Sequence, residues 1–80
     1  MLYRHFQKIN PTWPKKLSEC VGRRVRLRRD LETKGGELFL SGTEMYVVHA
    51  YRGGLSLDFS PSSPLAKIRK VEPRDVELIS

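Results

Sequence analysis

Five arginines fall within the seven residues RRVRLRR, and they are the side chains best suited to binding chemistry: Arg23, Arg24, Arg26, Arg28 and Arg29. Val25 and Leu27 separate them with the two-residue alternation of a half-buried strand. In a strand that rises ~3.3 Å per residue, alternate arginines would share one face at a spacing of about 6.6 Å. Phosphates along a nucleic-acid strand have a roughly similar spacing, and a guanidinium binds phosphate through two hydrogen bonds. The stretch therefore predicts a strand that binds nucleic acid.

The same arginine face also has a structural interpretation. Arginines on an exposed strand can pair with carboxylates that lie opposite them on neighbouring strands of the sheet. Four acidic residues are the candidates for such pairs: Glu37, Glu44, Asp58 and Glu77. The residue types alone leave both interpretations open.

The charge of the chain is unevenly distributed. Residues 1–29 hold nine Lys/Arg against one acidic residue, a net charge of +8, whereas residues 30–80 hold six against eight, a net charge of −2. A chain polarised in this way attracts polyanions to one end. Nucleic acid and an acidic protein partner both fit this field. Besides the five arginines, the predicted anion-binding set includes Lys15, Lys16 and Arg52.

Three aromatic residues are candidates for base stacking or for lining a peptide groove: Trp13, Tyr46 and Tyr51. Exposed aromatic rings on a basic β domain provide stacking platforms for bases. The alternative is that Trp13 covers an open end of the domain and the tyrosines cover strand edges. The spacing of these residues does not distinguish the two roles.

The sequence lacks the patterns of metal and catalytic sites. His5, His49 and Cys20 do not have the paired short spacings of a zinc site, and we expect no cofactor. Cys20 is expected to be a small buried apolar group and His49 a half-buried strand residue. No nucleophile elbow, phosphate-binding glycine loop or carboxylate pair is present, so we expect a non-enzymatic protein. A single cysteine and the lack of a membrane-length apolar run predict a cytoplasmic protein without disulfides.

Five short strands must position these residues. The first carries Val25 and Leu27 inward, and a loop over about residues 30–43 follows it. A hairpin comes next, with strands 44–51 and 55–60 joined by a turn at Arg52-Gly53-Gly54, because glycine accepts the positive φ of tight turns. Strand 65–71 has Ile68 in the core, and strand 76–79 follows a 3₁₀ turn at residues 72–75. The inward positions expected in the hairpin and the last strand are Met45, Val47, Leu55, Leu57, Phe59, Val76 and Leu78.

This order of elements resembles the SH3-like small β-barrels in the broad sense. The resemblance lies in the opening GRRVRL, residues 22–27, and the ending VEPRDVELI, residues 71–79. It is nearest to the small barrels that serve as accessory subunits of electron-transfer complexes. The first loop, LETKGG, lacks the acidic and aromatic signature with which true SH3 domains bind proline-rich peptides. The resemblance thus implies a fold and an accessory or protein-interaction role, without a ligand.

Together these features predict an all-β protein, a five-stranded SH3-like barrel over residues 22–80, preceded by an N-terminal arm or short helix over residues 1–21. The function expected first is a non-catalytic module that binds nucleic acid through its basic strand. The alternative is a protein-interaction module or an accessory subunit of a larger, redox-type complex, in which the arginines dock an acidic partner.

Overall fold

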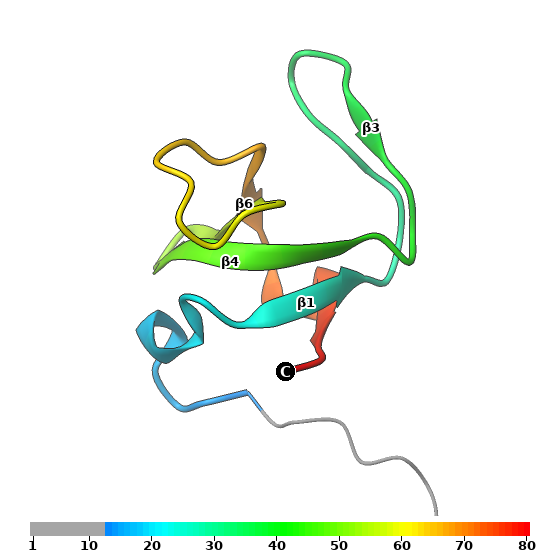
Figure 1. The fold of residues 1–80 in the computed structure, drawn as a ribbon. Helices are drawn as coiled ribbons and strands as arrows, with labels where there is room; N and C mark the ends of the chain where they lie inside the picture. Colours follow the sequence, from blue (N-terminus) through cyan, green and yellow to red (C-terminus); the bar gives the residue numbers. More distant parts are fainter. Residues whose placement is uncertain (1–12) are drawn as a thin grey trace, which may run out of the picture.

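The computed structural model describes residues 13–80 and is built almost entirely of strands (Figure 1). The expectations for His5 and for the arm before Trp13 lie outside the described residues. The elements in chain order are η2 (Leu17–Cys20), β1 (Arg24–Leu27), β2 (Leu31–Glu32), β3 (Leu38–Phe39), β4 (Glu44–Tyr51), β5 (Gly54–Asp58), β6 (Ile68–Val71), η3 (Pro73–Asp75) and β7 (Val76–Leu78). The prediction of an all-β protein is confirmed.

Five of the strands form one antiparallel sheet with the order β6-β5-β4-β1-β7. Within the described residues, β6 and β7 are the two edges of this sheet and do not pair with each other, so the sheet is not closed into a barrel. The loop expected over residues 30–43 contains a further hairpin, β2–β3, which forms a separate two-stranded sheet and whose turn projects away from the main sheet (Figure 1). A 3₁₀ turn, η2, lies within the segment for which the sequence predicts an arm or short helix.

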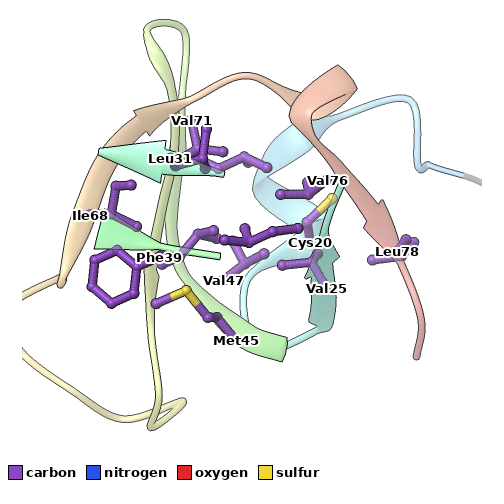
Figure 2. Packing of buried hydrophobic residues seen from close by; sticks show 13 residues of the cluster. Cys20, Val25, Leu31, Phe39, Met45, Val47, Ile68, Val71, Val76 and Leu78 are labelled. Carbon is purple, nitrogen blue, oxygen red and sulfur yellow. The ribbon is translucent and has the colours of Figure 1, made fainter. Parts of the chain in front are cut away.

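The core is a single apolar cluster enclosed by the sheet, the β2–β3 hairpin and η2 (Figure 2). Alternation in β1 and β7 buries the predicted residues, because successive side chains of a strand point to opposite faces. The confirmed inward positions are Val25, Leu27, Met45, Val47, Leu55, Leu57, Ile68, Val76 and Leu78. Cys20 is fully buried in the same cluster, and desolvation raises the pKa of its thiol, as expected of a buried apolar group.

The prediction of a half-buried His49 is wrong, because a β-bulge interrupts the alternation of β4. Val47 pairs with Leu57, but the next pair is His49 with Ser56, so Val48 is the extra residue. Val47 and Val48 are therefore both buried, and His49 is exposed on the outer face. A bulge of this kind shifts every later side chain of the strand to the other face.

The prediction that Phe59 points into the core is also wrong, because β5 ends one residue earlier. The carboxylate of Asp58 accepts hydrogen bonds from the backbone N–H of Phe59 at 2.6 Å and from the hydroxyl of Ser63 at 2.6 Å. These bonds turn the chain out of the strand. Phe59 is 51% exposed, and its ring lies against that of Phe39 with 6.0 Å between centroids.

The tight hairpin turn is one residue shorter than expected. Tyr51 pairs with Gly54, so Arg52 and Gly53 alone form the turn and Gly54 begins β5. Gly54 has a φ of 134°, and a Cβ at this position would lie 2.9 Å from the carbonyl oxygen of Val71. Glycine at this position therefore serves two needs, an unusual backbone conformation and the close approach of β5 to β6.

We expect Gly54→Ala to lower the free energy of unfolding by about 2 kcal/mol or more, because the added methyl group has no space against the β6 backbone. Urea denaturation followed by circular dichroism measures this change. Gly35→Ala is the matched control: its Cβ would make only an ordinary contact, 3.8 Å from the hydroxyl of Thr33. We expect the control to stay within about 0.5 kcal/mol of the parent. Equal stability of the two variants would contradict the packing argument.

Candidate functional site

The arginines of β1 face acidic residues on both neighbouring strands. Arg26 lies directly opposite Glu44 on β4 and Glu77 on β7. Its guanidinium donates to Glu77 at 3.1 Å and to Glu44 at 3.4 Å, and these hydrogen bonds raise its pKa. Arg24 also approaches Glu44, at 3.9 Å. The structural interpretation of the arginine face thus holds for Glu44 and Glu77.

Three further arginines of the RRVRLRR stretch contact the last residues of the chain. Arg23 donates to the main-chain oxygen of Ser80, and Arg28 donates to the main-chain oxygen of Val76 at 3.2 Å. Arg29 donates to the carboxylate of Asp75 at 2.9 Å. The register of the sheet causes these contacts, because β1 and β7 run antiparallel with Arg26 opposite Glu77. Residues 23–29 therefore lie alongside residues 75–80 over their whole length.

These contacts reduce the positive charge and the hydrogen-bond donors that the arginine face has available for an external anion. A phosphate at Arg26 would have to compete with two carboxylates already hydrogen-bonded to it. Such exposed pairs stabilise the fold only weakly, but they neutralise the local field. The other two candidate acids are placed differently: Asp58 binds Ser63, and Glu37 forms no ion pair within residues 13–80.

The other predicted site residues do not converge with the arginines. Trp13 is half-buried and packs against the core cluster. This position agrees with the alternative in which Trp13 covers one end of the domain. Tyr46 is half-buried beside Arg24, whereas Tyr51 and Arg52 lie at the far end of β4, beyond the residues that pair with β1. The exposed Lys15 and Lys16 precede η2. Whether any of these residues binds a ligand stays a prediction.

A different part of the surface carries an open basic groove. It has a volume of about 690 Å³ and lies between β6, with the residues just before it, and the segment around β2. Five cationic side chains line it, against two acidic ones, Glu32 and Asp75. One of the acids, Asp75, is already bonded to a cation of the groove. The cationic residues are Arg29, Lys34, Lys67, Arg69 and Lys70.

A second β-bulge, in β6, exposes two of these five cations. Leu55 pairs with Val71 and Leu57 with Ile68, so one residue of β5, Ser56, lies opposite two of β6, Arg69 and Lys70. Lys70 has a φ of 59°, a left-handed conformation that costs a non-glycine residue about 1 kcal/mol. The bulge places Arg69 and Lys70 in solvent together, while the residues on either side stay buried. Neither Arg69 nor Lys70 makes a side-chain hydrogen bond or ion pair within residues 13–80.

The lining of the groove below the cations is aliphatic. Leu31 from β2 and Ile68 and Val71 from β6 belong to the core cluster and also line the groove. Figure 2 shows Leu31 beside Val71 at one end of this cluster. Ala66 adds a small half-buried side chain. The site is thus an apolar surface with a cationic rim.

Of the five groove cations, sequence reasoning named only Arg29. It missed Lys34, Lys67, Arg69 and Lys70 because they are scattered over two segments of a half with net negative charge. One signal was present: in KIRKV, two consecutive cations stand between Ile68 and Val71, where strict alternation would bury one of them. That mismatch indicates a bulge.

One end of the groove is held by a buried carboxylate. Asp75 accepts from Arg29 at 2.9 Å and from the backbone N–H of Glu72 at 3.2 Å. The hydrogen bond from Arg29 is the main cause that lowers the pKa of Asp75, and burial opposes it. The same carboxylate thereby joins the segment that follows β1 to the N-cap of η3.

We expect Asp75→Asn to lower the free energy of unfolding by about 1–2 kcal/mol at pH 7, because a charge-assisted hydrogen bond is removed. A depressed pKa in the folded state stabilises the fold at pH values above the unfolded pKa of ~3.9, and the stabilisation disappears as the pH falls through the folded value. The gap between parent and variant should therefore narrow from pH 5 towards pH 2. Urea denaturation across this range measures it.

The control for this prediction is Glu37→Gln, which removes an exposed carboxylate without an ion pair among residues 13–80. We expect it to follow the parent within about 0.5 kcal/mol at every pH. A gap between parent and Asp75→Asn that stays constant down to pH 2 would show that the carboxylate does not act through its charge.

No cluster of three or more potential metal-binding His, Cys, Asp or Glu side chains occurs in residues 13–80. In that same part of the chain, no helix has the length and apolar character to cross a membrane. No model of a known protein family, no curated protein and no solved structure matches the chain. The groove and the arginine face are therefore the features from which a function can be inferred.

Proposed function

We propose that the chain is a small non-catalytic module that binds an anionic macromolecule in the basic groove beside β6. The observation that carries this proposal is the charge of the groove, where five cations meet two carboxylates and Arg69 and Lys70 have no partner within residues 13–80. The strained backbone at Lys70 is a second support, because such conformations gather at sites where ligands bind.

We also propose an SH3-like architecture for the module. The supporting feature is the order of elements: a first strand, a long loop that carries a hairpin, three further strands, a 3₁₀ turn and a last strand next to the first. This is the order on which the sequence resemblance depends. The resemblance implies a fold that hosts many binding functions, so the ligand has to be argued from the groove.

Nucleic acid bound by the basic strand is the second candidate. The observation that favours it is the surplus of positive charge before and within β1, where the exposed Lys15 and Lys16 make no side-chain ion pair among the described residues. Against it stand the contacts of Arg23, Arg26, Arg28 and Arg29 with the end of the chain. Binding by the basic strand and binding in the groove predict opposite results for two double variants that remove the same charge. One variant changes Arg69 and Lys70, and the other changes Lys15 and Lys16.

We expect the double variant Arg69→Gln, Lys70→Gln to weaken binding of a polyanion by about fivefold or more at low salt, because each ion pair that is removed contributes up to ~1 kcal/mol. Fluorescence anisotropy with labelled poly-L-glutamate and with a single-stranded thymidine 20-mer measures the affinities. If the DNA binds, the log–log slope of its affinity against salt should also fall by roughly 0.7 for each phosphate that the variant no longer neutralises.

The matched control is Lys15→Gln, Lys16→Gln, which removes the same charge from two other exposed residues. We expect less than a twofold change from this control. A larger effect from the control than from the β6 variant would favour the basic strand and its neighbours, and equal effects would mean that net charge alone attracts the polyanion. Binding of neither probe to the parent at ~50 mM salt would contradict both candidates.

A further inference from the structure

The aliphatic residues at the floor of the groove restrict the kinds of anionic ligand that can use the whole groove. A polyanion that binds through charge alone needs only the rim, whereas the small exposed parts of Leu31, Ile68 and Val71, which are 8%, 6% and 3% exposed, form a limited apolar surface beneath it. Apolar surface contributes to binding only when an apolar group of the ligand covers it. A ligand that uses the whole groove must therefore combine negative charges with an aliphatic group.

Nucleic acid fits this combination poorly. Proteins that hold single strands stack the bases on aromatic side chains, and none of the described residues that line the groove is aromatic. Trp13 packs on the core, and Tyr46 and Tyr51 lie on β4, outside the lining. A nucleic acid in the groove would contact the rim cations through phosphates alone.

An extended protein segment fits the groove better. Six consecutive residues, 66–71, line it, so the backbone of β6 runs along its length. Among the described strands, β6 pairs only with β5, which leaves its other edge without a partner strand. Extended peptides bind edges of this kind through main-chain hydrogen bonds, with alternate side chains in adjacent pockets.

We propose that the groove binds an extended acidic protein segment that carries an aliphatic residue among its carboxylates. The carboxylates would pair with Arg69 and Lys70 on one wall and Lys34 on the other, and the aliphatic side chain would cover Leu31 and Ile68. This inference rests on the proposed function, because it names the partner class of the same groove.

Three probes of equal length test the proposal. The first is a fluorescent ten-residue peptide that alternates glutamate with leucine and valine. The second replaces each apolar residue of that peptide by serine and keeps every carboxylate. The third is a single-stranded thymidine 10-mer. We expect the first peptide to bind about tenfold more tightly than the second, because partial burial of one aliphatic side chain contributes about one factor of ten.

Charge reversal locates the binding site. Lys34→Glu should weaken binding of the apolar-containing peptide at least fivefold. The double variant Ser60→Glu, Ser62→Glu lowers the net charge by the same amount at two exposed residues outside the groove lining, and it should change binding less than twofold. Amide chemical shifts of the ¹⁵N-labelled protein should move in residues 66–71 and 31–35 when that peptide is added. Circular dichroism of both variants verifies that they are folded.

The outcomes separate the two proposals. Equal affinity for both peptides, or shifts confined to other residues, would overturn the acidic-segment inference. If the thymidine 10-mer binds with shifts at residues 66–71 while neither peptide binds, the groove is an anion site and only the partner class is wrong. If none of the three probes binds, the proposed function itself fails.

Discussion

The pairing of β1 with both β4 and β7 is the constraint on which the rest of the structure depends. This pairing brings the end of the chain back to its first strand, and it places Glu44 and Glu77 on either side of Arg26. Val25 and Leu27 then face the core fully buried, while the arginines lie over the neighbouring strands. An arginine-rich strand can lie between two other strands of a sheet because its charges meet carboxylates and main-chain oxygens of the same chain.

Because of that arrangement, the positive charges without an ion-pair partner do not lie where the basic residues are most frequent in the sequence. The first 29 residues hold most of the basic side chains, yet the side chains of four of the five arginines in RRVRLRR contact residues 75–80. The groove cations without partners among residues 13–80 come from the half of the chain whose net charge is negative. Net charge along a sequence therefore indicates that anions are attracted, but it does not locate the surface that holds them.

The groove is also a product of tight backbone packing. Gly54 allows β5 to approach β6 so closely that a Cβ would collide with the Val71 carbonyl, and next to it Lys70 adopts a left-handed conformation. The bulge so formed turns Arg69 and Lys70 outward together and keeps Ile68 and Val71 on the floor. Asp75 holds Arg29 at the same groove. One local irregularity of a strand thus contributes two of the five cations of the groove and two of the aliphatic residues that line it.

The class of fold, the five strands of the sheet and most of the core follow from the amino-acid sequence alone, because the alternation of apolar residues is a local property that burial enforces strand by strand. The sequence also indicated the 3₁₀ turn at residues 72–75 and the buried state of Cys20. The exposure of His49 and Phe59, the partners of the arginines and the position of the groove could not be predicted before the strands were assembled. These depend on which residues lie opposite each other across strands distant in sequence, and a bulge of one residue in β4 or β6 reassigns every side chain that follows it.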